Sequence, residues 1–291
     1  VTTQGPYLVR DEMARIIGIA NEEVRVIPTA CGGGFGGKLD LSVQPLIGIA
    51  AWVLGVPIRG IYHRMESMAS TTKRHPSKIH AKYACNTEGD LVSFELDGDF
   101  NTGAYSSWGL TVKDRVPVHS TGPYFVPNVT AKTRALYTNE TPAGAFRGFG
   151  IPQAAIAHEN LMDRMAEKIG MDPLEFRHRN AIRKGQKTVT GQTLRASAGF
   201  DQCLERLRGP WKVARREAEV FNNEQTGTLR RGVGIGSMWY GCGNTSISNP
   251  STMHLGLSSD GEVTLYSGAQ DIGQGTNTTM VQVAADALGI S

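Results

Sequence analysis

Glycine is the residue type whose distribution points most directly to a binding site. The chain has 35 glycines in 291 residues, and many of them fall in four short segments, residues 32–37, 144–150, 232–243 and 268–275. Glycine accepts positive φ angles and lets backbone N–H groups approach a ligand closely. The four segments therefore predict loops that converge on one large polar ligand, with tight turns between strands as the structural alternative.

The segment at residues 32–37 matches two phosphate-binding motifs in part. Gly32 to Lys38 has P-loop spacing, but Leu39 stands where a Ser or Thr would bind Mg²⁺. The same glycines fit the dinucleotide fingerprint, yet residues 46–62 contain no acid to bind a ribose. Both gaps argue against nucleotide binding. We expect instead a loop at a helix N-terminus, whose N–H groups bind an anionic or oxo ligand.

The second glycine segment places an arginine between two aromatic residues. Arg147 lies between Phe146 and Phe149, just before an expected helix. A guanidinium is a rigid fork of donors for a phosphate or an oxo group, and a phenyl ring can form an apolar wall for a flat substrate. The alternative is that both rings belong to the core and that Arg147 forms a surface ion pair.

The composition narrows the class of protein. Hydrophobic residues make up 40% of the chain and charged residues 20%, which is typical of a folded globular protein. The 30 basic and 27 acidic residues form no basic block that would bind nucleic acid, and no apolar stretch is long enough to span a bilayer. The spacing of Cys31, Cys85, Cys203 and Cys242 does not fit a zinc or iron–sulfur site, so we expect no metal ligated directly by the protein.

Alternating helix and strand patterns must position these loops. Apolar residues recur at helical spacing in residues 9–19, 43–54 and 152–169. Strand-like patterns occur in residues 24–27, 58–62, 78–85 and 91–100, with a hairpin turn expected at residues 86–89. Asp172 is expected to cap a helix that begins at Pro173, with Glu175 completing a capping box.

The polar residues 209–231 predict a linker between a first lobe, residues 1–208, and the beginning of a second, truncated lobe, residues 232–291. Strands are expected in the second lobe at residues 233–237, 254–258 and 262–266, with a turn at residues 259–261. Gln4-Gly5 and Gln274-Gly275 each precede a helical pattern, which suggests a duplicated α+β unit. The chain therefore has the pattern of an internal fragment.

Three segments together resemble the molybdenum hydroxylases, the family of xanthine dehydrogenase and aldehyde oxidase. They are residues 31–38 (CGGGFGGK), 144–153 (GAFRGFGIPQ) and 271–284 (DIGQGTNTTMVQVA), which resemble molybdopterin-binding segments of that family in the same order. Residues 74–76 and 171–177 resemble further landmarks, and residues 238–244 (MWYGCGN) resemble bacterial purine or nicotinate hydroxylases. The resemblance implies an α+β fold of duplicated two-layer α/β lobes.

The resemblance implies contacts to a molybdenum–molybdopterin cofactor, with its cytosine dinucleotide form left open. Gln4 would hydrogen-bond an oxo ligand or the pterin, and Gln274 would hold the pterin or its phosphate. The complete implied set is Gln4, Gly34, Phe35, Gly36, Arg147, Gly273, Gln274 and Gly275.

The resemblance also implies a substrate pocket. Arg115 falls where purine-oxidising members place a substrate-orienting arginine, and Phe149 would stack on a flat aromatic substrate. Leu39 stands where those members carry a glutamate, so the purine-binding acid is missing unless Asp40 replaces it.

The resemblance implies an oxidoreductase, with parts that this chain does not carry. The general base, a glutamate of a later Gly-rich segment, is expected beyond Ser291, so the fragment alone is expected to lack a catalytic residue and to be inactive. The rest of the molybdopterin domain and the 2Fe–2S and FAD domains or subunits would be its partners, in the cytoplasm.

The expected reaction is hydroxylation of an N-heteroaromatic, xanthine- or hypoxanthine-like small molecule with oxygen from water. A nicotinate- or aldehyde-oxidising enzyme of the same family, and a noncatalytic cofactor-binding or assembly module, are the alternatives.

Overall fold

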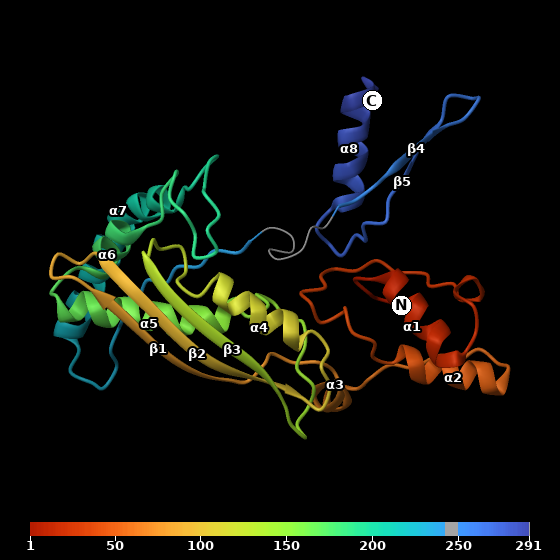
Figure 1. Ribbon diagram of the computed structural model, residues 1–291, viewed down its shortest axis with the longest axis horizontal. Helices are drawn as coiled ribbons and strands as arrows, with labels where there is room; N and C mark the ends of the chain where they lie inside the picture. Colours follow the sequence, from red (N-terminus) through yellow and green to blue (C-terminus); the bar gives the residue numbers. More distant parts are fainter. Residues whose placement is uncertain (242–249, 291) are drawn as a thin grey trace.

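The computed structural model describes residues 1–241 and 250–290 of the chain (Figure 1). Helices and small sheets are mixed along the chain, which confirms the predicted α+β class. Cys242 and Gly243 of the third glycine segment, Asn244 of the MWYGCGN segment and Ser291 lie outside the described residues.

The central body is built on a three-stranded sheet. Its strands are β1 (Ser77–Cys85), β2 (Leu91–Gly103) and β3 (Asn128–Tyr137), in the order β1-β2-β3. β1 and β2 form an antiparallel hairpin whose predicted turn is confirmed by the 3.0 Å hydrogen bond from Asn86 N to Asp90 O. β2 and β3 are parallel, and the crossover between them contains α4 (Gly109–Val118), which packs on β3.

One face of this sheet carries the core of the described structure. Side chains on β2 alternate in burial, and Phe94, Leu96 and Phe100 are at most 2% exposed. They belong to one hydrophobic cluster with Met162 on α5 (Ile151–Lys168) and Phe176 on α6 (Pro173–Asn180). The sheet and its helices form a two-layer unit (Figure 1).

The N-terminal part consists of short helices joined by loops. The helices are α1 (Pro6–Ile17), η1 (Asn21–Glu23), α2 (Gln44–Leu54) and α3 (Arg64–Ser70), and α1 packs on α2. The predicted strands at residues 24–27 and 58–62 are wrong: neither segment is assigned as a strand. The loop at residues 32–37 does not open a helix either, because α2 begins only at Gln44, after turns and bends at residues 35–43.

The predicted linker is partly helical. α7 (Phe200–Glu224) continues through residues 209–224, although Pro210 lies inside it. α7 is amphipathic and buries Leu204 and Ala218, which explains why a mostly polar sequence forms a helix here. Residues 233–237 are not a strand. The domain boundaries themselves stay a prediction.

The C-terminal part is a hairpin followed by a helix. β4 (His254–Leu257) and β5 (Val263–Tyr266) are antiparallel, with the predicted turn between them, and α8 (Thr276–Leu288) follows. α8 ends as α1 does: Gly289 and Gly18 have positive φ, and Ile290 N and Ile19 N bond to Ala285 O and Ala14 O at 3.0 and 3.1 Å. Gly55 ends α2 with a positive φ as well, so this common helix ending leaves the duplication a prediction.

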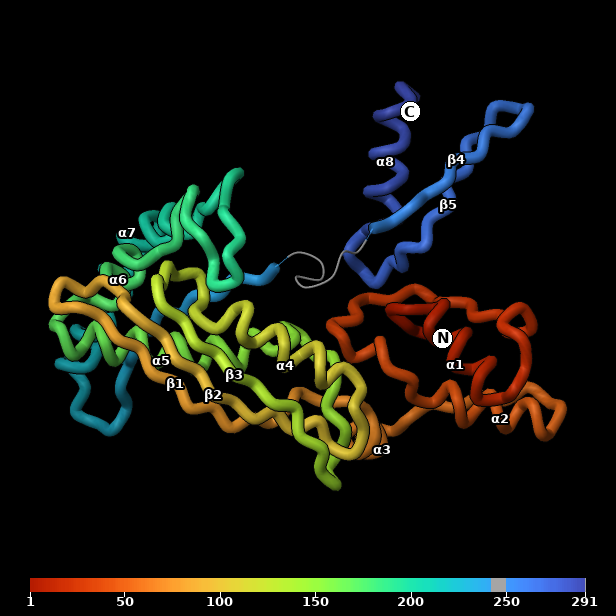
Figure 2. The backbone as a smooth tube through the Cα atoms, viewed as in Figure 1, coloured from red at the N-terminus to blue at the C-terminus, as the bar shows by residue number. Residues whose placement is uncertain are grey.

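Two further features concern the whole described chain. The smooth backbone trace shows the β4–β5 hairpin and α8 projecting from the rest of the molecule on the side of α1 (Figure 2). None of the helices in the described ranges is long and apolar enough to span a bilayer.

Candidate cofactor and substrate pocket

One pocket of about 390 Å³ gathers residues that lie far apart in the sequence. Among the residues predicted to form the site, its walls include Gln4, Phe35, Gly36, Leu39, Arg115, Arg147 and Phe149. Tyr240 and Ile272 line it as well. All four glycine segments therefore border the same pocket, the third through Tyr240 and the fourth through Ile272.

Gln4 is locked onto the first glycine loop. Its Oε1 accepts hydrogen bonds from Gly36 N at 2.9 Å and Lys38 N at 3.3 Å. A Cβ atom at Gly34 would lie 2.4 Å from Gln4 Cδ, so a glycine at this position admits the side chain. Because both donors are backbone N–H groups, the oxygen must face the loop. The Nε2 donor of Gln4 is the part that can serve a ligand.

The first two glycine loops touch backbone to backbone. Gly36 has a φ of +86°, and a Cβ atom there would lie 2.8 Å from the carbonyl carbon of Ala145. The preceding Phe35 also has a left-handed φ, +53°, and its ring is 62% exposed. The guanidinium of Arg147 lies 5.5 Å from the centroid of this ring. The strained backbone at Phe35 thus lies where the two loops that border the pocket contact each other.

A second arginine supports the Arg147 loop from behind. Arg74 donates hydrogen bonds to Arg147 O and to Gln153 Oε1, and its guanidinium lies 4.8 Å from the Phe146 ring centroid. Burial lowers the pKa of Arg74 from its ordinary value. Arg147 itself has no acidic partner among the described residues, which argues against the alternative that it forms a surface ion pair.

Arg115 lies between two aromatic rings at the pocket wall. Its side chain is 8% exposed, and Nη1 donates a 2.9 Å hydrogen bond to the hydroxyl of Tyr240. Its Cζ lies 4.8 Å from the Tyr240 ring centroid and 5.7 Å from that of Phe149. Asp114, the acid next to it in sequence, pairs with Lys113 instead. Arg115 is therefore an oriented cation that the pocket can present to an anion or a carbonyl.

Among the described residues that line this pocket, no acid takes the place of the glutamate expected in purine-oxidising relatives. Leu39 lines the wall, whereas Asp40 does not. Asp40 Oδ1 instead accepts a 2.8 Å hydrogen bond from Ser107 Oγ. Its Oδ2 is buried, with no partner among the described residues, 2.9 Å from where a Cβ of Gly144 would lie. Asp40 therefore does not replace the missing glutamate.

Lys38 has a structural role in the first loop. Its Nζ donates to Gly33 O at 2.8 Å and to Cys31 Sγ at 3.1 Å. A P-loop lysine would instead direct its ammonium to a bound phosphate. This contact agrees with the argument against nucleotide binding.

The third predicted cofactor segment approaches the first loop without placing its glutamine in the pocket. A Cβ at Gly273 would lie 3.1 Å from Gly33 N, so the two loops are in close contact. Gln274 Oε1 accepts from Ile272 N at 2.7 Å, and its Nε2 donates to Gln270 O and Thr276 Oγ1. Gln274 is thus folded onto its own turn and does not line the pocket with Gln4, while its neighbour Ile272 does.

Tyr240 is a pocket residue that sequence reasoning missed, as is Ile272. Tyr240 lies within a glycine segment that the sequence singles out, and the aromatic pair at residues 239–240 between glycines was the available signal. Nothing local connects it to Arg115, which is 125 positions away.

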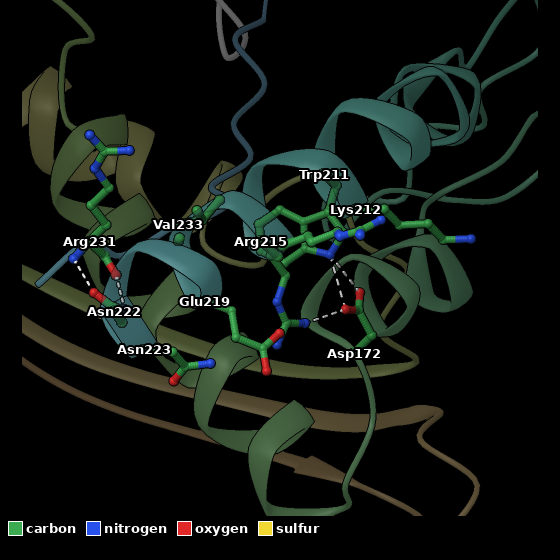
Figure 3. A pocket seen from close by; sticks show the side chains of 11 residues that line it. Asp172, Trp211, Lys212, Arg215, Glu219, Asn222, Asn223, Arg231 and Val233 are labelled. Carbon is green, nitrogen blue, oxygen red and sulfur yellow. Dashed lines mark hydrogen bonds and ion pairs between the residues drawn. The ribbon is translucent and has the colours of Figure 1, made fainter. Parts of the chain in front are cut away.

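A larger cleft, of about 700 Å³, lies along α7 and is bordered by Asp172, Arg231 and Val233; it contains none of the predicted cofactor or substrate residues (Figure 3). Asp172 there accepts from Trp211 Nε1 at 3.0 Å and from Arg215 Nη1 at 2.7 Å. It also accepts from Leu174 N and Glu175 N, which confirms Asp172 as the N-cap of α6; the Glu175 carboxylate pairs with Arg208 instead of completing the predicted capping box. The polar side chains of this cleft therefore have a structural role, in capping α6 and in pairing charges.

The pocket fits a cofactor that is held by hydrogen bonds. Gln4 Nε2 and the Arg147 guanidinium are donors suited to oxo and phosphate groups, and Gly34 and Gly36 permit close packing of the loops around them. Within the described ranges, no group of three His, Cys, Asp or Glu side chains could ligate a metal ion.

Comparison with known proteins agrees with this geometry. A family model described as a molybdopterin cofactor-binding domain matches residues 1–181, and a second model of the same description matches residues 206–291. The chain is 41% identical over 226 residues to the nicotinate dehydrogenase large molybdopterin subunit of Eubacterium barkeri, covering 78% of this chain and 52% of that protein. It is 35% identical to the xanthine dehydrogenase molybdenum-binding subunit of Escherichia coli O157:H7, covering 99% and 38%.

A solved structure shares the fold. The aldehyde oxidoreductase from Desulfovibrio gigas matches with a TM-score of 0.87 and 31% identity, covering 99% of this chain and 31% of that one. The chain thus spans about half, or less, of the length of the relatives it matches. It belongs to the molybdenum hydroxylase family, through its molybdopterin cofactor-binding domains.

Proposed function

We propose that the pocket binds an N-heteroaromatic ring bearing a carboxylate or a ring carbonyl, and that the protein to which this chain belongs hydroxylates that ring. The observation that carries the proposal is Arg115, held between the rings of Phe149 and Tyr240 at the pocket wall. A guanidinium offers two parallel donors to a carboxylate, and such charge-assisted bonds orient the ligand as well as bind it.

A carboxylate-bearing ring fits the wall better than a purine does. Leu39 and Ala145 are apolar, and no carboxylate lines the described part of the pocket to accept a hydrogen bond from a ring N–H. An aromatic acid requires only the cation of Arg115 and an apolar surface for its ring. Nicotinate is therefore the preferred model substrate, and xanthine is the second.

Gln4 and Arg147 are the side chains that would hold the molybdopterin cofactor. The bound cofactor supplies the redox centre and the activation of water that hydroxylation requires. The chain's own residues contribute hydrogen-bond donors from Gln4 and Arg147 and apolar surface that excludes water from the ring. The cytosine dinucleotide form, the 2Fe–2S and FAD partners and the cytoplasmic location stay predictions from the sequence.

The proton acceptor is proposed to lie outside this chain. The described lining of the pocket includes no Asp, Glu or His side chain. A hydroxylation that begins by deprotonating a nucleophile needs such a group within hydrogen-bond reach. The isolated chain is therefore proposed to bind the cofactor without turning over substrate.

The test uses the full-length protein purified with its natural partners. We expect it to contain molybdenum and a pterin and to hydroxylate nicotinate with oxygen from isotopically labelled water, faster than it hydroxylates xanthine. A molybdenum-loaded protein that oxidises only an uncharged aldehyde would overturn carboxylate recognition. A full-length protein that binds the pterin yet turns over none of the three would instead favour the noncatalytic module.

A further inference from the structure

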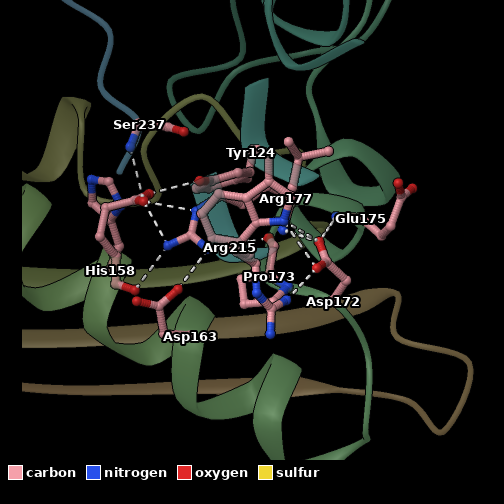
Figure 4. Close-up of polar contacts among 12 residues, drawn as sticks. Tyr124, His158, Asp163, Asp172, Pro173, Glu175, Arg177, Arg215 and Ser237 are labelled. Atoms are coloured by element: carbon pink, nitrogen blue, oxygen red, sulfur yellow. Dashed lines mark hydrogen bonds and ion pairs between the residues drawn. The ribbon is translucent and has the colours of Figure 1, made fainter. Parts of the chain in front are cut away.

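Residues 232–241 form a strap that crosses the sheet-and-helix body and ends at the pocket. Ser237 N donates a 2.9 Å hydrogen bond to Glu159 Oε2 on α5, within the polar network around Arg177 (Figure 4). Glu159 also accepts from Tyr124 Oη at 2.7 Å and from Arg177 Nε at 2.9 Å. This network anchors the middle of the strap to the packed body.

His119 anchors the end of the strap. Its ring is 3% exposed, and Nε2 accepts a 3.1 Å hydrogen bond from Gly241 N. The other ring nitrogen, Nδ1, lies 3.1 Å from the carbonyl oxygen of Arg115, one helical turn back. The ring stacks on Tyr240, with centroids 6.1 Å apart at 25°, and meets Trp239 edge-on at the same distance.

These partners determine the protonation state of the imidazole. The Arg115 carbonyl can only accept, so Nδ1 must carry the hydrogen, and the Gly241 N–H can only donate, so Nε2 must be bare. The bridging ring is therefore the neutral Nδ1–H tautomer. A protonated imidazole has no acceptor and would lose the Gly241 contact.

We propose that neutral His119 is a positioning residue of the substrate pocket, which holds the strap on α4 so that Tyr240 orients the Arg115 guanidinium. The strap contact stands on the geometry alone. Its consequence for substrate rests on the proposed function of Arg115.

The surroundings of His119 give this contact a pH dependence. Burial lowers the pKa of His119 below its ordinary value of 6.5, and the neighbouring Arg115 charge lowers it further, against the raising effect of the Arg115 carbonyl. Of the described groups, Arg115 is the only charge that acts on this pKa. β2, β3 and α5 also pack on α4, and they bring no further charge to the ring. The strap brings the rings of Trp239 and Tyr240 against it. The strap contact is thus complete above pH 6.5 and weakens as the pH falls below it.

The test compares two substitutions in the full-length, cofactor-loaded enzyme. His119→Gln can retain an acceptor near the Nε2 position, whereas His119→Phe removes donor and acceptor. At a fixed pH above 6.5, we expect amide hydrogen exchange of peptides covering residues 232–241 to be about 10-fold faster in the Phe variant and near wild type in the Gln variant. Equal exchange in all three proteins would overturn the proposal.

A pH series separates positioning from simple packing. After correction for intrinsic exchange rates, strap exchange in the wild type should accelerate below pH 6.5, and the Gln variant should lack this change. Identical profiles would contradict the role of the neutral ring. If the Phe variant does not fold, Gly241→Pro removes the N–H group that donates to His119 and should speed strap exchange in the same way. Unchanged strap exchange in the Gly241→Pro variant would overturn the contact.

Kinetics distinguish failure of the strap from failure of the proposed substrate. In the Phe variant we expect KM for nicotinate to rise about 10-fold with little change in kcat, while KM for an uncharged aldehyde stays near wild type. Faster strap exchange with unchanged KM for every substrate would overturn carboxylate recognition by Arg115, and the positioning of the strap by His119 would stand.

Discussion

The two walls of the pocket differ in how the fold holds them. The wall of Arg115 and residues 144–150 is backed by a core, since Val112, Val116 and Ile151 beside it are at most 1% exposed. The wall of Tyr240 and Ile272 comes from residues 232–290, where no described residue is buried. One wall is held by packing, and the described part of the other by a few hydrogen bonds and ring contacts.

This difference separates fixed from adjustable parts of the site. The buried side chains of α4 restrict its movement, so the backbone at Arg115 is expected to be the more fixed part of the pocket. Within the described part of the chain, the strap is held by hydrogen bonds from Ser237 N and Gly241 N and by the bond between Tyr240 and Arg115, each of modest net strength. Substrate discrimination is therefore expected to be most sensitive to changes on the second wall, and stability to changes behind the first.

The largest expected effect concerns a group that neither described wall contributes. The isolated 291-residue chain should show no hydroxylase turnover with an artificial electron acceptor, because loss of a general base alone lowers rates by roughly 10²–10⁴-fold. The measurement is single-turnover oxidation of nicotinate, with the full-length enzyme as control. Turnover by the pure chain at a rate near that of the full-length enzyme would place a base on one of these walls.

A core substitution tests the packed wall. Phe100→Ala should lower the free energy of unfolding by about 3–5 kcal/mol, because Phe100 is fully buried in the sheet core. Leu255→Ala on β4, where the side chain is 51% exposed, should change it by less than about 0.5 kcal/mol. Denaturant unfolding measures both, and similar losses for the two variants would remove the contrast between the regions.

Arg115 tests recognition at the junction of the two walls. Arg115→Met in the complete enzyme should lower kcat/KM for nicotinate roughly 10-fold or more, since charge-assisted bonds contribute about 1.5–3 kcal/mol. An uncharged aldehyde should be spared. Asp114→Asn is the matched control, because Asp114 pairs with Lys113 and should leave all substrates unchanged. Equal losses for charged and neutral substrates would exclude a specific role for Arg115.

The smallest effect tests the contact between the first two glycine loops. Gly36→Ala should destabilise the chain by about 1–2 kcal/mol, because φ is +86° and the new Cβ would press on the Ala145 backbone. Gly32→Ala meets no atom within 4 Å and has no positive φ, so its unfolding midpoint should stay near wild type. Equal tolerance of both changes would argue against the close approach of the loops.

Local patterns predicted the elements whose signal is carried by their own residues. The helices at residues 9–19, 43–54 and 152–169 and the β1–β2 hairpin formed, because apolar spacing and turn chemistry are local. The segments at residues 24–27 and 58–62 have strand-like composition but no ladder. A strand exists only with a partner, which composition does not specify.

Elements with weak or interrupted patterns were missed. α4 begins at a glycine and contains Pro117, and α7 continues past Pro210 through a polar stretch. Their helicity depends on packing against β3 and α6, which a local pattern does not contain. For the same reason the parallel strand β3 was recognised only in the structure.

The sequence by itself determined the family, the glycine loops and most residues that border the pocket, because these motifs are contiguous and specific. Only the tertiary structure brought Tyr240 to Arg115 and Gly241 to His119, across 125 and 122 positions. It also turned Gln274 onto its own loop and Asp40 toward Ser107. Side-chain direction depends on which backbones pack together, and residue type and spacing alone do not contain that information.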